Sequence, residues 1–419
     1  MKKNLFYMGK KFQHYKMAEY LKSKFKTIIL DEKLYFFEGK IYKSNDYLLK
    51  RKMTELEITI KESQRQEVLH TLKYISPNEE HSSANFIAVR NGVIDINTNQ
   101  LYLHSPDYII TSLINVDYNE NAYNPFVDDL FNTISNENEE VIKLLKEIVG
   151  YTLYRSNFLG KAFLLKGEGG NGKSTFLRAI TGLLGKDNIT SLSISELGSK
   201  FNTGLLNGKL ANIGDDVPYT EIKDTSVFKK LTTGETLKGE NKNQSPFFFE
   251  NYSKLIFSAN RIPKIRDQSQ GFKDRFVIVP FTKRIRDSLK EDHFFNNKIT
   301  SQSAKEYLLM LGIHHLSLLL KKEKFTLPQI VKEEIEDFDL NNNIVRLWLE
   351  YFIEEGGDEQ ELIIGDAYLS YVSFIKWNGI KNQISKKAFT KELEMLGYQS
   401  TKKYVRTGEV RTQKRIMKK

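Results

Sequence analysis

Short apolar runs alternate with helical repeats through the centre of this 419-residue chain. Four continuous apolar runs stand at Ala162–Leu165, Leu210–Ile213, Lys254–Ser258 and Phe276–Val279. Runs of this length are typical of strands in a parallel sheet that helices cover on both faces. The pattern therefore predicts an α/β fold built on a parallel sheet.

The regions beside the predicted sheet follow other patterns. Upstream, Phe86–Val89 has strand character, and residues 125–154 repeat apolar positions at i, i+3, i+4 and i+7. A polar stretch at 76–83 indicates a loop or boundary. Downstream, a helix is expected at 304–320, and a polar break at Asp337–Asn343 predicts the start of a last segment.

The last segment predicts three helices and a hairpin. Helical patterns cover 344–355, 366–377 and 385–396, and a turn is expected at Thr407-Gly408. Three helices followed by a hairpin is the winged-helix pattern, although a generic helical cap shares most of these signals.

The strongest chemical signal follows the first apolar run. The sequence from Gly167 to Thr175 satisfies G-x-x-x-x-G-K-[ST], with a predicted strand before it and an apolar-faced helix, Ser174–Leu184, after it. Glycines let successive backbone N–H groups point at one phosphate, and the helix N-terminus adds its positive dipole end. Lys173 would neutralise the β- and γ-phosphates of ATP, and Ser174 would bind Mg²⁺. The predicted nucleotide-binding residues are Gly167, Gly169, Gly170, Asn171, Gly172, Lys173, Ser174 and Thr175.

Two carboxylates end the second apolar run. Asp215 and Asp216 stand about 40 residues after the phosphate loop, and adjacent like charges at a strand end favour a bound cation. We assign Asp215 mainly to the metal shell and Asp216 mainly to activation of water, and either residue could hold either role. The alternative interpretation is an exposed acidic turn before Pro218.

Polar residues also mark the third and fourth runs. Asn260 follows the third run and could contact the γ-phosphate, or could simply be a turn residue before Pro263. Arg275 precedes the fourth run, where its fixed charge could complete the site of an adjacent subunit. Arg261 and Arg266 compete for that role.

Residues 234–249 suggest a hairpin that reaches into a pore. Lys238 and Lys242 lead into Phe247–Phe249, and lysines on such a hairpin can hold a phosphate backbone without reading bases. The alternative is a solvated hairpin whose aromatic residues lie in the core.

Positive charge gathers at the two ends of the chain. Residues 1–75 hold 17 basic and 9 acidic residues, and residues 381–419 hold 12 basic residues against 3 glutamates. The total charge is +10, which is less than the charge of the two ends together, so the centre carries a net negative charge. This distribution suggests contact with a polyanion at the ends, unless it reflects only the lysine-rich surfaces of proteins from AT-rich genomes.

The basic tail offers candidate DNA contacts. Ser385 is expected to cap the last helix. This helix as a recognition helix, with the basic hairpin as a wing, would suit duplex DNA at an origin. The candidate residues are Lys386, Lys387 and Lys391 on the helix and Arg406 and Arg411 beside the hairpin turn. A solvated basic face used for subunit packing is the alternative.

Together these motifs resemble those of superfamily 3 helicases, specifically the poxvirus-type primase-helicase group also found in phages, plasmids and staphylococcal mobile elements. The resemblance covers roughly residues 85–419. It includes the following landmarks in order: Arg90–Asp95, Gly150-Tyr151, Gly167–Thr175, Asp215-Asp216, Gly234-Glu235, Glu240-x-Lys242, Leu255–Pro263, Asp267 and Gly271–Phe281.

The resemblance implies an AAA+-like motor that assembles into hexameric rings and moves along one DNA strand, typically 3′ to 5′. It makes Lys242 the hairpin lysine that follows DNA, Asn260 the sensor and Arg275 the finger. The expected division is a basic accessory region at 1–80, a helical collar at 81–155, the motor at 156–336 and a winged-helix domain at 337–419. Only about 80 residues precede the helicase part, so a separate primase or host replication proteins are expected partners.

Several function classes are disfavoured. The chain has no cysteine, which excludes disulfides and thiolate metal sites and favours the cytosol, most simply that of a bacterial host. No apolar run approaches the roughly 20 residues needed to span a bilayer.

A P-loop ATPase without processive unwinding, such as a DNA-binding initiator, clamp loader or small-molecule kinase, is the alternative to a helicase.

Overall fold

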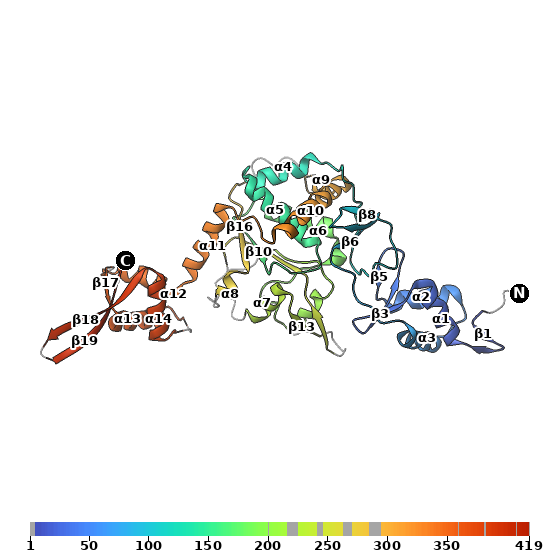
Figure 1. The fold of residues 1–419 in the computed structure, drawn as a ribbon, viewed down its shortest axis with the longest axis horizontal. Helices are drawn as coiled ribbons and strands as arrows, with labels where there is room; N and C mark the ends of the chain where they lie inside the picture. The colour runs from blue at the N-terminus through green and yellow to red at the C-terminus, as the bar shows by residue number, and fades with distance from the viewer. Residues whose placement is uncertain are drawn as a thin grey trace.

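The computed structural model describes residues 5–199, 201–215, 225–240, 246–262, 270–284, 295–358, 360–380, 383–407 and 409–418. Figure 1 shows an extended arrangement: the N-terminal helices lie at one end, a parallel sheet lies at the centre, and the C-terminal hairpin lies at the other end. None of the helices in the described ranges is long and apolar enough to cross a membrane.

The N-terminal unit has its own apolar core, formed by residues such as Met17, Leu21, Met53 and Leu72. Its three helices pack around short strands, and the Asn45 side chain caps the second helix by accepting from the Leu48 N–H. The elements are β1 (Tyr7–Met8), β2 (Lys11–Phe12), α1 (His14–Phe25), β3 (Ile28–Leu30), β4 (Lys33–Phe37), β5 (Tyr42–Lys43), α2 (Asp46–Leu56) and α3 (Glu62–Ile75).

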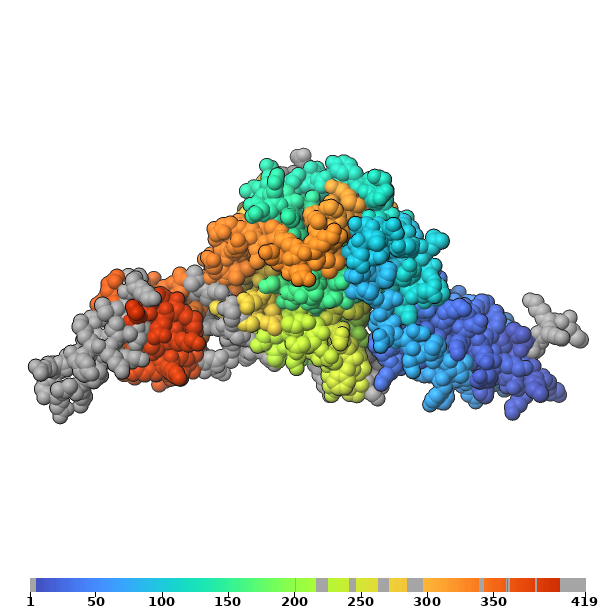
Figure 2. Space-filling model, viewed as in Figure 1, coloured from blue at the N-terminus to red at the C-terminus, as the bar shows by residue number. Residues whose placement is uncertain are grey.

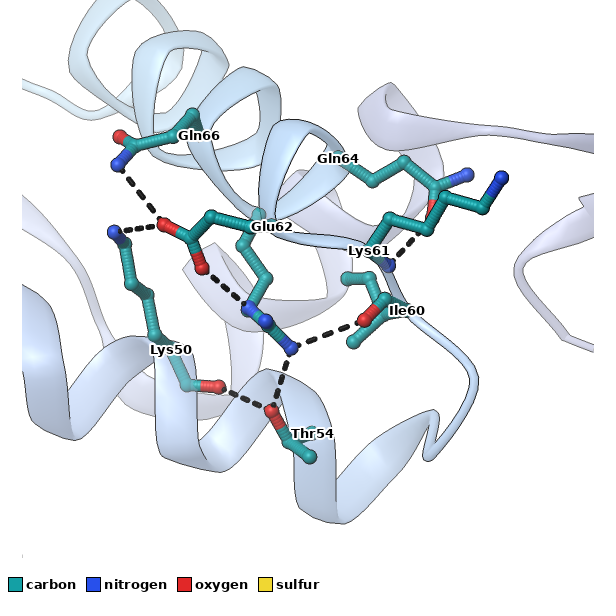
Figure 3. A network of polar contacts seen from close by, with 8 residues as sticks. Lys50, Thr54, Ile60, Lys61, Glu62, Gln64 and Gln66 are labelled. Atoms are coloured by element: carbon teal, nitrogen blue, oxygen red, sulfur yellow. Dashed lines mark hydrogen bonds and ion pairs between the residues drawn. The ribbon is translucent and has the colours of Figure 1, made fainter.

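A polar network joins α2 to α3 (Figure 3). The Glu62 carboxylate accepts from the Lys50 ammonium at 2.5 Å, from Arg65 Nε at 3.0 Å and from Gln66 at 3.1 Å. Hydrogen bonds from Lys50 and then Arg65 lower the pKa of Glu62 to about 2. Arg65 also donates to Thr54 and to the Ile60 carbonyl, so one guanidinium ties both helices to the loop between them.

A four-stranded sheet and two helices lead into the central sheet. The strands, in the order β8-β7-β6-β9, are β6 (Phe86–Val89), β7 (Gly92–Asp95), β8 (Gln100–Tyr102) and β9 (Leu113–Ile114). The helical pattern at 125–154 forms two helices, α4 (Pro125–Ile134) and α5 (Glu139–Leu153). They separate because Asn136 and Glu137 have positive φ angles, after which Asn138 caps α5.

The central sheet has five parallel strands in the order β11-β12-β15-β10-β16. The four predicted apolar runs all form strands, with ends shifted by at most one residue, and the short edge strand β11 was not predicted. The bounds are β10 (Ala162–Lys166), β11 (Ile189–Thr190), β12 (Ala211–Gly214), β15 (Lys254–Ala259) and β16 (Phe276–Pro280). The prediction of an α/β fold with a parallel sheet is confirmed, and the sheet fits a P-loop-like domain.

Alternating strand residues face two apolar layers. Phe163 and Leu165 join one layer with α5 and α10, whereas Leu164 joins the other with α7 and the β13–β14 hairpin. The remaining elements are α6 (Lys173–Leu184), the 3-10 turns Lys186–Asn188 and Thr203–Leu206, α7 (Ser226–Thr233), β13 (Thr236–Gly239), β14 (Phe247–Glu250), α8 (Gln270–Lys273), α9 (Phe295–Ile299) and α10 (Gln302–Lys322).

Helices α5 and α10 cross at two glycines. A Cβ on Gly150 would lie 2.5 Å from the Gly312 carbonyl oxygen, and a Cβ on Gly312 would lie 2.8 Å from Leu153. Neither position has room for a side chain, which gives Gly150 a packing role.

The polar stretch Asp337–Asn343 is helical up to Asn342 instead of forming a break, but the last segment begins directly after it, as predicted. Helix α11 (Gln329–Asn342) runs through it, because Phe338 is buried against the sheet layer and anchors the polar turns around it. The helix ends only where the Asn343 side chain caps α12 (Ile344–Glu354).

The tail contains the three predicted helices and the predicted hairpin. The elements are α12, β17 (Glu361–Ile363), α13 (Ile364–Trp377), α14 (Lys386–Met395), β18 (Tyr398–Thr407) and β19 (Glu409–Lys418). Strand β17, which was not predicted, pairs with β19 to make a three-stranded sheet. Ser385 caps α14 as predicted, by accepting from the Ala388 N–H.

Candidate functional site

The carboxyl ends of β10, β15 and β12 meet at one edge of the sheet. Because the strands are parallel and adjacent, the segments that follow them lie side by side. Those segments are the phosphate loop after β10, Asn260 after β15 and Asp215 after β12. Topology therefore gathers three of the sequence motifs at a single edge.

Glycines set the shape of the phosphate loop. Gly170 and Gly172 have φ angles of 86° and 89°, in the left-handed region that favours glycine. A Cβ on Gly167 would lie 2.4 Å from the Phe281 carbonyl oxygen, so the loop packs directly on the end of β16. The buried Asn171 amide donates to the same carbonyl, which ties the loop to the sheet.

Lys173 lies at the centre of this loop. Its side chain is buried, and its ammonium donates to the Gly167 carbonyl, to the Glu168 carbonyl at 2.8 Å and to Asn171 Oδ1 at 3.1 Å. Asn260 Oδ1 lies 3.5 Å from the same ammonium. The cation and the strand-end amide therefore meet at the mouth of the loop.

Asp215 is oriented by a residue to which the sequence analysis assigned no role. The Ser258 hydroxyl, which is buried on the neighbouring strand β15, donates to Asp215 Oδ1. A single serine in an apolar strand gives no sequence signal, and only the pairing of β12 with β15 reveals its role. Asp216 lies outside the described residues.

Arg275 lies at the other edge of the sheet. It immediately precedes β16, and its carbonyl accepts from the Ala162 N–H at the start of β10. The five residues of β16 place it roughly 16 Å from the carboxyl edge, at about 3.3 Å per residue. Its Nε is buried and has no hydrogen-bond partner among the described residues.

Lys161 shares this amino edge with Arg275 and was missed by the sequence analysis. Its ammonium donates to the Asp274 carbonyl. Burial lowers the pKa of Lys161; the charge of Asp274 opposes this shift, and that of Arg275 adds to it. The two cations therefore lie close enough to interact. Of the two competing arginines, Arg261 directly follows Asn260 at the carboxyl edge, and Arg266 lies outside the described residues.

The predicted hairpin is formed by β13 and β14, which pair antiparallel. Lys238 is on its exposed face, with its ammonium 3.0 Å from Glu240 Oε1. Lys242 lies outside the described residues. The interpretation of the aromatic residues as core fits Phe249 but is wrong for Phe248, whose side chain is 71% exposed because it points to the opposite face of the strand.

The tail residues are only partly described. Lys386, Lys387 and Lys391 are exposed on α14, while Phe389 and Leu393 of the same helix are fully buried. Arg406 and Arg411 lie on β18 and β19 near the turn, paired with Val410 and Val405. The positions of those two arginine side chains lie outside what the structure describes.

The upstream Arg90-Asn91-Gly92 segment has a structural role. The Arg90 guanidinium donates to both carboxylate oxygens of Asp117 and lowers the pKa of that carboxyl. The Asn91 amide exchanges two hydrogen bonds with the backbone of Tyr118. These contacts hold the segment between β9 and α4.

Comparisons with known proteins support the predicted resemblance to primase-helicases. Residues 4–148 match the family described as D5 N terminal like, and residues 165–275 match a family of unknown function, DUF5906. The helicase-named protein 184R of Invertebrate iridescent virus 6 is 25% identical over 373 residues, covering 73% of this chain and 36% of that protein. The helicase-named protein 121R of Invertebrate iridescent virus 3 is 22% identical, covering 68% and 34%.

These matches show that the chain is similar to the D5-like primase-helicase family. It spans about a third of the length of these curated relatives. Two solved structures of the NrS-1 C-terminal region share its fold. They have TM-scores of 0.53 and 0.54 at 15% and 13% identity, and cover 97–100% of this chain and 98–100% of theirs. The two viral relatives are named as helicases, so the predicted resemblance to the primase-helicase group is confirmed.

Proposed function

We propose that this chain is an ATP-dependent DNA helicase and replication initiator of a phage, plasmid or related mobile element. The observation that carries the proposal is the separation of charged groups between the two edges of the sheet. Lys173, Asn260 and Asp215 lie at the carboxyl edge, and Arg275 lies at the amino edge. The strand order, with β15 between the loop strand β10 and the acidic strand β12, supports an AAA+-like motor.

The loop residues suit ATP and Mg²⁺. The backbone around Gly170 and Gly172 would bind the phosphates, and Lys173 would neutralise the β- and γ-phosphates by exchanging loop carbonyls for phosphate oxygens. Mg²⁺, held by Ser174 and Asp215, would withdraw charge from the phosphates. Ser258 orients Asp215, and Asn260 would position the attacking water, with Asp216 as its base.

Arg275 would act in a neighbouring subunit. Since the sheet separates it from the nucleotide of its own chain, its guanidinium can complete a site only across an interface, and Lys161 would accompany it. This requirement supports a closed ring, and we propose a hexamer.

The flanking parts would handle DNA. In the ring, Lys238 and Lys242 of the hairpin would follow single-stranded DNA. We propose that residues 337–419 form a winged-helix domain, since the order α12, β17, α13, α14, β18, β19 and the exposed lysines of α14 suit contact with origin duplex DNA. The proposed division keeps an accessory region at 1–80, a collar at 81–155 and a motor at 156–336. A separate primase or host replication proteins are the proposed partners.

Unwinding of forked DNA by the purified chain tests this function. We expect ATP hydrolysis that single-stranded DNA stimulates, and strand separation that Lys173→Ala abolishes. Hydrolysis that is indifferent to DNA would contradict the helicase. Stimulated hydrolysis without strand separation would instead support the second candidate, a P-loop ATPase that acts as a DNA-binding initiator or remodeller.

A further inference from the structure

The β13–β14 hairpin has one buried face and one exposed face. Leu237 and Phe249 point inward and belong to an apolar layer of the sheet, with exposed fractions of only 7% and 8%. Gly239 approaches the backbone of Gly204, and a Cβ on Gly204 would lie 3.2 Å from the Glu240 backbone. The inward face is therefore closely packed.

The N-terminal unit also contacts the first residue of β14, which is in the pair Gly239–Phe247 farthest from the base of the hairpin. The Lys33 ammonium, from β4, lies 4.5 Å from the ring centroid of Phe247. Figure 2 shows the hairpin region projecting from the lower rim of the central domain, beside the N-terminal unit. A hairpin braced in this way can present its outer face in a fixed orientation.

Phe248 dominates the outer face. It is 71% exposed and lies directly opposite Lys238, and the next pair towards the base on the same face is Thr236 with Glu250. The Lys238 ammonium turns along its own strand to Glu240 rather than over the Phe248 ring. Exposed single apolar residues are common in proteins, so the location of Phe248 carries the argument: it faces outward on β14, directly opposite the exposed Lys238 of β13.

We infer that Phe248 is a base-stacking site for single-stranded nucleic acid, with Lys238 beside it as the phosphate contact. Every base offers a π-face, so an aromatic ring binds bases without regard to sequence, and a neighbouring cation follows the backbone. Such a contact would suit a motor that moves along DNA of any sequence. The inference rests on the proposed DNA-translocating function, and it adds stacking to a hairpin for which lysines alone were expected.

Binding without turnover tests the site. The probe is a fluorescein-labelled 30-mer of dT, titrated against the full chain with a non-hydrolysable ATP analogue. Stacking contributes roughly 1–3 kcal/mol per base, so Phe248→Ala should weaken binding about 10-fold, and Phe248→Trp should restore it. Tyr123→Ala, which removes a ring 65% exposed elsewhere, is the matched control and should bind as wild type.

Two further signatures separate stacking from a structural effect. On a 30-mer made of abasic sites throughout, Phe248→Ala and wild type should bind equally weakly, because no bases remain to stack. Lys238→Ala should reduce the slope of log affinity against log salt by about 0.7, whereas Phe248→Ala should leave the slope unchanged.

Several outcomes would overturn the inference. Wild-type affinity of Phe248→Ala for the dT 30-mer excludes stacking, and so does an equal loss on the abasic strand. A change in particle mass of Phe248→Ala without DNA would assign the ring to a subunit contact instead. If wild type binds the 30-mer but never unwinds a fork, the proposed helicase fails while the stacking site can still be measured.

Discussion

The two edges of the central sheet carry different kinds of charged group. At the carboxyl edge, the Lys173 ammonium is held by loop carbonyls, and Asp215 is held by Ser258. At the amino edge, Arg275 has a buried Nε without a partner among the described residues. Lys173 and Asp215 can bind a ligand by exchanging these partners, whereas the Arg275 Nε, which lacks a partner among the described residues, can donate to an acceptor that arrives from outside. The difference suggests a site divided between two subunits.

The largest expected effect comes from removing the charge at each edge separately. Lys173→Ala and Arg275→Ala should both reduce ATP hydrolysis, the second by about 10³-fold, which is the lower range for an arginine finger. Only Lys173→Ala should also lose nucleotide binding, measured with a fluorescent ATP analogue. A loss of binding in Arg275→Ala would place that arginine in its own chain's site.

Mixing the two variants is the control for this prediction. A Lys173→Ala subunit still supplies Arg275, and an Arg275→Ala subunit still supplies a complete loop. Some hydrolysis should therefore return at intermediate mixing ratios. Additive residual rates at every ratio would contradict a shared site.

A smaller effect is expected from Ser258 in β15, with the serine that directly precedes this strand as its control. Ser258→Ala should lower hydrolysis by roughly 10-fold and raise the Mg²⁺ concentration needed for half-maximal rate, because residues that orient metal ligands typically contribute 10–100-fold. Ser253 is the matched control: it is fully buried at the amino end, and its hydroxyl has no hydrogen-bond partner among the described residues. Ser253→Ala should leave both values unchanged; an equal loss there would mean that either change merely disturbs the strand.

The smallest effect is expected from Glu62, which is remote from both edges. Its pKa of about 2 lies below the ordinary 4.5, so its contribution to stability is present above about pH 4.5 and is lost as the pH falls towards 2. Glu62→Gln should lower Tm at pH 7 by only on the order of 1–2 °C, because ion pairs of an exposed carboxylate such as Glu62 contribute little to stability. The difference from wild type should shrink at pH 3, and hydrolysis should not change. A Tm difference that is constant with pH would exclude the carboxylate as its source.

Local patterns predicted much of the fold. Continuous apolar runs identified β10, β12, β15 and β16, and capping residues such as Ser385 marked a helix start. The break expected at Asp337–Asn343 failed because the burial of one residue, Phe338, outweighed the polar character of its neighbours. Strands of two or three residues, such as β11 and β17, carry too few positions to show a period.

In the candidate site, the sequence alone identified the residues that could bind a triphosphate. The phosphate loop is one contiguous segment, so its glycines, lysine and serine are already neighbours along the chain. Tertiary structure alone decided which distant residues join it. Strand pairing brought Ser258 to Asp215, the direction of β16 separated Arg275 from its own loop, and the alternation of β14 turned Phe248 outward. These contacts depend on which strands become neighbours in the sheet and on which face of its strand each residue lies. The residues adjacent to a position in the sequence do not determine its strand neighbours or its face.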